Sequence, residues 1–257
     1  MTASYPNVLL EVCVSSVTDV LAAAAAGANR VELCGGLELG GLTPSLGLVE
    51  SVLAVSTVPV VVMLRPRAGG FHYDRHEFSV MCRDAQLFLG LGVQGIVFGL
   101  LDENGNVDSC RSRELVQLAG RRDAVFHRAF DFVGNQIEAL DTLSEIGCKR
   151  ILTSGGKSLA SQGAGTVRNL LQHAAGRIEV LPGGGINANN VIEIIKTTDC
   201  QQIHIGASAP CDDGSISDGS SIQLCDERFR QGFAHRKVVG ELVGDVAQAL
   251  HRHGARC

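Results

Sequence analysis

Two acid–thiol pairs with the same spacing stand in the N-terminal part of the chain. Glu11-Val12-Cys13 and Glu32-Leu33-Cys34 each place a glutamate two residues before a cysteine. Side chains alternate between the two faces of a β-strand, so each Glu and its Cys share a face if these segments are strands. Neighbouring strands lie about 4.8 Å apart, and two inward thiolates at that separation could hold one soft cation such as Cu(I). Packing of two small apolar side chains in a core is the alternative.

Further polar residues stand at the ends of other β-branched runs. Arg65 and Arg67 follow the third run, His127 and Asp131 end and follow the fifth, and His204 lies in the eighth. Buried charges need partners, so we expect the glutamates of the acid–thiol pairs to pair with Arg65 or Arg67. Together these positions are candidates for catalysis: Glu11, Glu32, Arg65, Arg67, His127, Asp131 and His204.

Glycines follow the seventh and eighth runs. Gly183, Gly184 and Gly185 come after the seventh, and Gly206 comes after the eighth. Backbone N–H groups at this place commonly bind phosphate in (β/α) barrels. We therefore predict an anion or phosphate site here, to which Arg65 and Arg67 would add charge; tight turns without a ligand are the alternative reason for these glycines.

The elements that must position these residues alternate along the chain. Short β-branched runs are followed by helical patterns, which is typical of repeated βα units and a parallel sheet. We predict a single-domain TIM (β/α)8 barrel over residues 1–257, with an eight-strand core over 8–206, a long loop over 207–234 and a final helix over 235–253; a doubly wound open sheet is the alternative. The eight predicted strands are Leu9–Val14, Arg30–Cys34, Pro59–Leu64, Gly95–Gly99, Ala124–His127, Arg150–Thr153, Ile178–Leu181 and Gln202–Ile205.

Composition narrows the classes of function. The 257 residues carry 22 basic and 27 acidic side chains, a net charge of -5, which gives no electrostatic footprint for nucleic acid. No apolar run approaches the roughly 20 residues of a membrane-spanning helix, and Met1–Pro6 does not resemble a signal peptide. The nine cysteines are dispersed without CxxC pairs, so we expect free thiols in the reducing cytoplasm.

An ordered set of motifs resembles the CutC copper homeostasis protein family. The resemblance implies a TIM barrel, self-association as a dimer or tetramer, and copper handling in the cytoplasm, with a nuclear pool in animal members. It also implies Cu(I) binding by Cys13 and Cys34, and no catalytic activity. One departure is Ile205, where animal members often carry a cysteine, so a third sulfur is absent there. The motifs are Glu11–Ser16, Arg30–Cys34, Gly40–Ser45, Arg65–Phe71, Val97–Gly99, Phe126–Asp131, Leu152–Gly155 and Pro182–Ile186.

Three functional hypotheses stay open at this point. The first is a cytoplasmic copper-binding protein whose ligands are the two thiolates. The second is an enzyme for a small anionic or phosphorylated metabolite, with His127 or Glu32 as general base, the two arginines binding charge and Gly183–Gly185 holding phosphate. The third is a structural oligomer in which the cysteines only pack.

Overall fold

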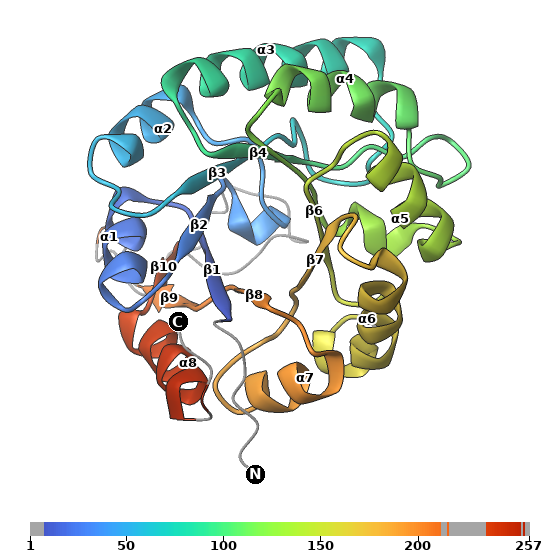
Figure 1. The fold of residues 1–257 in the computed structure, drawn as a ribbon. Helices are drawn as coiled ribbons and strands as arrows, with labels where there is room; N and C mark the ends of the chain where they lie inside the picture. Colours follow the sequence, from blue (N-terminus) through green and yellow to red (C-terminus); the bar gives the residue numbers. More distant parts are fainter. Residues whose placement is uncertain (1–7, 212–214, 216–234, 253, 255–257) are drawn as a thin grey trace, which may run out of the picture.

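Eight parallel strands form a barrel inside a ring of helices (Figure 1). The protein is seen in a computed structural model that describes residues 8–211, 215, 235–252 and 254. The architecture confirms the predicted single-domain TIM barrel. The strands are β1 (Leu9–Val14), β2 (Arg30–Leu33), β3 (Val60–Met63), β4 (Gly95–Phe98), β5 (Asp123–Phe126), β6 (Arg150–Thr153), β7 (Glu179–Pro182) and β8 (Gln202–Ile205).

The barrel is closed between its first and last strands. Hydrogen bonds link the strands in the order β7-β6-β5-β4-β3-β2-β1-β8. The remaining junction, between β7 and β8, is joined by a parallel bridge between Gly183 and His204. Closure brings β8 beside β1, so residues nearly 200 positions apart in the chain become neighbours.

A helix follows each strand and covers the outside of the barrel. Local signals fix several helix starts: the Ser16 hydroxyl accepts from Asp19 N, and Asp74 forms a capping box with Glu77. No described helix is both long enough and apolar enough to cross a lipid bilayer. The helices are α1 (Val17–Ala25), α2 (Leu46–Leu53), α3 (Arg75–Leu91), α4 (Ser109–Ala119), α5 (Gln136–Glu145), α6 (Ala160–Ala174), α7 (Val191–Thr198) and α8 (Gly240–Arg252), with short 3-10 helices η1 (Leu37–Leu39) and η2 (Arg128–Phe132).

Strand alternation divides the apolar core into two parts. On β1, Leu10 and Val12 belong to the large core between the strands and helices, whereas Cys13 packs with a smaller cluster inside the barrel. That inner cluster contains Cys34, Val61, Met63, Val97 and Val125. Residues two apart on a strand share a face, so Glu11 and Cys13 both face the barrel interior, as do Glu32 and Cys34.

The C-terminal segment differs from the prediction. The helix expected from His235 is wrong at its start, because α8 begins only at Gly240. His235–Val238 instead forms β10, which pairs antiparallel with β9 (Ser208–Cys211) in the segment that was predicted to be a loop. This pairing joins segments far apart in the chain, so no local pattern could indicate it. The rest of the predicted loop, 212–214 and 216–234, and position 253 lie outside the described residues.

Candidate functional site

The two sulfurs of the acid–thiol pairs lie together at the C-terminal end of the barrel. Cys13 is near the end of β1, and Cys34 directly follows β2, where its N–H donates to Val14 O. Their Sγ atoms are 3.8 Å apart. Cys34 is buried and Cys13 is partly buried, so the thiols face an enclosed space and not bulk solvent.

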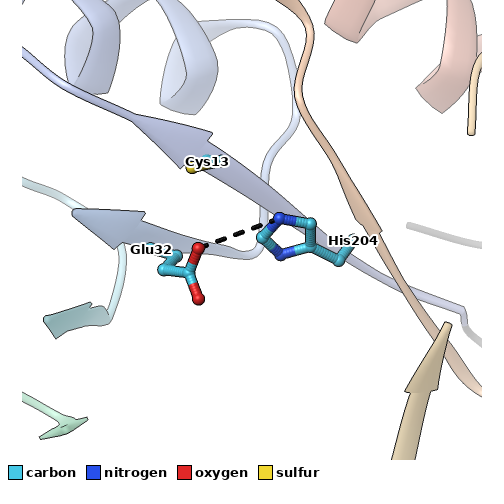
Figure 2. Close-up of side chains that lie close together, drawn as sticks. All are labelled: Cys13, Glu32 and His204. Atoms are coloured by element: carbon cyan, nitrogen blue, oxygen red, sulfur yellow. Dashed lines mark ion pairs between the residues drawn. The ribbon is translucent and has the colours of Figure 1, made fainter. Parts of the chain in front are cut away.

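Cys13, Glu32 and His204 form a compact cluster of three metal-binding side-chain types (Figure 2). They come from three adjacent strands, β1, β2 and β8, and the strand register places Cys13 opposite Glu32. One ligand atom from each residue lies within 4.8 Å of the others, and His204 Nε2 is 3.8 Å from Glu32 Oε2. The cluster therefore offers sulfur, oxygen and nitrogen donors around one point.

Glu11 orients the histidine of this cluster. His204 Nδ1 lies 2.8 Å from Glu11 Oε1, and the other oxygen of Glu11 pairs with Arg30. Arg30 is held in turn by the side-chain oxygen of Gln202, 3.1 Å away. Burial would raise the pKa of Glu11, but the hydrogen bond with His204 and the charge of Arg30 outweigh it and lower that pKa to about 2. Glu11 is therefore a carboxylate at neutral pH.

The electrostatics of the cluster separate its two thiols. A hydrogen bond with Cys34 is the main cause that lowers the pKa of Cys13 to about 5, against the effect of burial. The same bond and burial raise the pKa of Cys34 well above its ordinary value. Burial raises the pKa of Glu32 to about 8. Burial would lower the pKa of His204, but the interactions of its imidazole with Glu32, Cys13 and Glu11 outweigh burial and raise that pKa. The favoured state at neutral pH is a Cys13 thiolate beside a Cys34 thiol.

The expected pairing of the glutamates with Arg65 or Arg67 is wrong. Arg65 donates to the backbone carbonyls of Leu39, Gly41 and Gly69. Arg67 pairs with Glu77 on α3. The physical reason is register: Arg30 stands opposite Glu11 on the neighbouring strand, so it reaches that carboxylate directly.

A cavity of about 290 Å³ opens beside the thiols. Its lining includes four of the seven sequence-predicted catalytic candidates: Glu32 and His204 of the cluster, and Arg65 and His127 outside it. Arg67 and Asp131 are not among the described lining residues. The complete lining is Cys13, Glu32, Cys34, Leu37, Gly40, Gly41, Met63, Arg65, Phe71, His127, Arg128, Phe132, Leu152 and His204.

His127 and Asp131 have different surroundings. The N–H of Ala129 donates to His127 Nδ1 at 3.0 Å, and burial followed by the charge of Arg65 lowers the pKa of His127 to about 3. The neutral ring then carries its proton on Nε2, which makes it a hydrogen-bond donor and not a free base. Asp131 accepts from Thr153 Oγ1, Ser154 N and other groups of the turn after β6, so it ties two loops together.

The glycines predicted to bind phosphate form the turn after β7. Gly184 and Gly185 have φ angles of 111° and 68°, which favour glycine over other residues. A Cβ on Gly183 would lie 2.6 Å from Leu152 Cδ1, so this glycine also permits close packing. Gly183–Gly185 and Gly206 are not part of the described cavity lining. The phosphate role of these residues stays a prediction.

Sequence reasoning missed the groups that support the site. Arg30, Arg150 and Gln202 link Glu11 to the opposite side of the barrel interior, since Gln202 Oε1 accepts from both arginines. Each of the three is the first residue of its strand. Arg30 lies two residues before Glu32, a spacing that could have placed it on the same inward face.

Comparisons with known proteins identify what this chain resembles. The sequence profile of the CutC family matches residues 8–209. A family protein CutC from Treponema denticola is 44% identical over 216 residues, which cover 84% of this chain and 88% of the relative. The human protein named copper homeostasis protein cutC homolog is 40% identical over 216 residues, covering 84% of this chain and 79% of the relative. The crystal structure of CutC from Streptococcus agalactiae has a TM-score of 0.73 at 32% identity, covering 77% of this chain and 98% of that one.

Proposed function

The chain belongs to the CutC family, and on that premise we propose that it binds Cu(I) through Cys13 and Cys34 and serves in copper homeostasis. The name of the human relative, copper homeostasis protein cutC homolog, supports the cellular role. The main structural support for Cu(I) binding is the short distance between the two sulfurs, 3.8 Å between their Sγ atoms.

The spacing of the sulfurs suits a single bridging ion. Two metal–thiolate bonds of about 2.3 Å each reach across at most about 4.6 Å. This span exceeds the separation of the Cys13 and Cys34 sulfurs, so a bent S–metal–S arrangement needs no movement of the strands. Thiolates select soft ions such as Cu(I). The lowered pKa of Cys13, to about 5, supplies one thiolate without an added base.

Neighbouring donors determine how copper competes with other metals. Glu32 and His204 lie close to Cys13 and offer oxygen and nitrogen, donors that also suit Zn²⁺. Cys34 instead adds a second sulfur, which Cu(I) favours. A site that uses both thiols therefore prefers Cu(I), whereas a site of Cys13, Glu32 and His204 alone would accept Zn²⁺.

A competition titration tests the proposal. Cu(I) is titrated under anaerobic conditions into the wild type and a Cys13→Ser/Cys34→Ser variant, with a chromophoric Cu(I) chelator as competitor. We expect one Cu(I) per chain in the wild type and at least a hundredfold weaker binding in the double variant. Cys110→Ser removes an exposed thiol on α4 and is the matched control, with unchanged affinity. Equal affinity in the wild type and the double variant would remove the site, and stronger binding of Zn²⁺ than of Cu(I) would reassign the metal.

Assembly and location form a separate part of the proposal. The family resemblance supports a dimer or tetramer in the cytoplasm, with a nuclear pool if the source is an animal, and the dispersed cysteines support a reducing compartment. Light scattering of the purified chain and fractionation of cells that produce it test these two statements. A monomer at micromolar concentration would contradict the first, and a chain found only outside the cytoplasm and nucleus would contradict the second.

A further inference from the structure

The cavity beside the thiols has a second wall that metal binding does not use. Arg65 follows β3 and His127 follows β5, and both line the cavity that also contains Cys13 and Cys34. Arg65 and His127 are 7% and 4% exposed. A buried cation and a buried imidazole at one cavity call for a chemical reason, because burial of polar groups without partners costs free energy.

The charge of Arg65 is not neutralised by a carboxylate. Its two terminal nitrogens donate to three backbone carbonyls at 2.8–3.0 Å. Within residues 8–211 and 235–252, no acidic side chain makes an ion pair with it, and Arg65 Nε has no hydrogen-bond partner. The three carbonyls fix the guanidinium in place but do not neutralise its charge, and they leave two of its five N–H groups, that of Nε and one on a terminal nitrogen, without a carbonyl acceptor.

His127 offers a second donor at the same wall. Its Nδ1 accepts from Ala129 N, so the neutral ring places its proton on Nε2. Burial and the charge of Arg65 keep this ring neutral by lowering its pKa to about 3. In the part of the chain that the structure describes, Nε2 has no hydrogen-bond partner. The site thus holds two fixed donors without acceptors.

An aromatic residue joins the two donors and gives the wall an apolar surface. The Phe71 ring lies 5.4 Å from Arg65 Cζ and 5.1 Å from the ring of His127. Phe71 also packs against Phe132, whose side chain is 69% exposed, and Leu152 lines the same cavity. Aromatic and aliphatic walls with few fixed polar groups are typical of small-molecule sites, and about 290 Å³ lies at the small end of their range.

We propose that this wall binds a small organic molecule with a carboxylate and an apolar body, the carboxylate accepting hydrogen bonds from Arg65 Nε and His127 Nε2. The apolar body packs on Phe71 and Leu152. A carboxylate fits better than a phosphate, because the glycine turn that would supply further backbone donors, Gly183–Gly185, lies outside the lining. This binding does not depend on copper, so it goes beyond the proposed function.

Titration calorimetry of the metal-free protein with 3-phenylpropionate tests the ligand class. The neutral 3-phenylpropan-1-ol and inorganic phosphate serve as comparison probes. We expect 3-phenylpropionate to bind at least tenfold more tightly than either. The Cu(I) competition titration is repeated with His127→Asn, and unchanged Cu(I) affinity there separates this site from the copper site, since His127 lies outside the cluster of Cys13, Glu32 and His204. Absence of 3-phenylpropionate binding, or equal binding of the acid and the alcohol, would overturn the proposal.

A pair of histidine variants locates the binding. His127→Asn keeps a side-chain acceptor for Ala129 N and so preserves the cap of η2, but it loses the Nε2 donor. We expect it to melt near the wild-type temperature and to bind 3-phenylpropionate at least tenfold more weakly. His72→Asn makes the same substitution at an exposed position of the loop after β3 and is the control, with unchanged binding. Equal affinity of His127→Asn and wild type, or an equal loss in His72→Asn, would contradict the assignment.

Discussion

At the residue scale, four charges in the barrel interior balance one another. The carboxylate of Glu11 faces Arg30 and His204, and the thiolate of Cys13 faces the same imidazole. With the pKa of Glu32 raised to about 8, its carboxyl is largely protonated at neutral pH and adds little charge. Two cations and two anions therefore share this space, which reduces the cost of burying each of them. A bound monovalent cation would replace the proton that the two thiols share.

The lowered pKa of Cys13 predicts an unusual pH profile for its alkylation. The thiolate is the reactive form, and a group whose pKa is about 5 stays a thiolate between pH 6 and pH 8. In the metal-free protein, we expect the rate of Cys13 alkylation by iodoacetamide to stay nearly constant over that range and to fall about tenfold per pH unit below pH 5. Mass spectrometry of the digested protein at timed intervals measures this rate.

A second thiol, Cys148, and a His204 variant provide references for this profile. Burial raises the pKa of Cys148 to about 12, so this residue should not react in the folded protein at any pH in the range. A His204→Gln variant should shift the Cys13 profile to higher pH, because the hydrogen bond and charge of His204 help to lower the pKa. A Cys13 rate that climbs tenfold per unit from pH 6 to pH 8 would show an ordinary thiol and contradict the charge distribution.

At the element scale, alternation along the strands made much of the site predictable. The spacing Glu-x-Cys in β1 and β2 places each acid and its thiol on one face, and closure of the barrel makes that face the interior. The same alternation places Met63 and Arg65 on one side of the segment that ends β3. Strand boundaries were predictable to within about one residue because β-branched runs end at turn residues.

Contacts between distant segments were not predictable in this way. The pairing of β9 with β10 and the choice of Arg30 over Arg65 as the partner of Glu11 depend on register between segments. Alternation alone does not decide which polar residues become partners, because any of several polar residues satisfies the same pattern. The cavity wall at Phe71 was missed for the same reason, since its loop folds over the barrel only through tertiary contacts.

The side chain of Asp19 links the paired strands β9 and β10 to the barrel. Its removal should lower the stability of the fold and loosen β10. This buried side chain accepts from Ser15 N at 3.0 Å and from Val238 N at 2.9 Å. Asp19→Ala leaves these buried donors unpaired, at about 1–3 kcal/mol for each lost partner. We expect urea denaturation to show a free energy of unfolding lower by about 2 kcal/mol, and hydrogen exchange to accelerate at Val238.

An exposed aspartate in α8, the helix that follows β10, supplies the control for Asp19→Ala. Asp245 lies on the outer face of α8, and Asp245→Ala should alter the free energy of unfolding by no more than about 0.5 kcal/mol. Equal effects of the two substitutions, or unchanged exchange at Val238 in Asp19→Ala, would show that Asp19 does not hold β10 in place.

At the scale of the whole molecule, the barrel interior is divided along its axis. The first residues of β5, β6, β7 and β8 form an ionic cluster at the N-terminal end, in which Arg150 reaches Asp123, Glu179 and Gln202. The thiols and the cavity lie at the C-terminal end of the strands. In (β/α) barrels the N-terminal end generally serves stability and the C-terminal end serves function. The same division is expected here.

Substitutions at the two ends should therefore affect different properties: stability at the N-terminal end and Cu(I) affinity at the C-terminal end. Arg150 is 2% exposed, and Arg150→Met removes the cation that holds two carboxylates, so we expect the free energy of unfolding to fall by about 3 kcal/mol. The folded fraction should keep the wild-type Cu(I) affinity, since Arg150 reaches the site only through Gln202, and Arg30 keeps its own bond to Glu11 when Arg150 is replaced. Cys13→Ser should instead lose Cu(I) affinity with a smaller fall in the free energy of unfolding than Arg150→Met, because serine is close to cysteine in size and its hydroxyl can still bond to a neighbouring group. Urea denaturation and the Cu(I) competition titration, applied to both variants, measure the two quantities.

A large loss of Cu(I) affinity in folded Arg150→Met would show that the ionic cluster positions the thiols, and the division of the barrel into two independent ends would then be wrong.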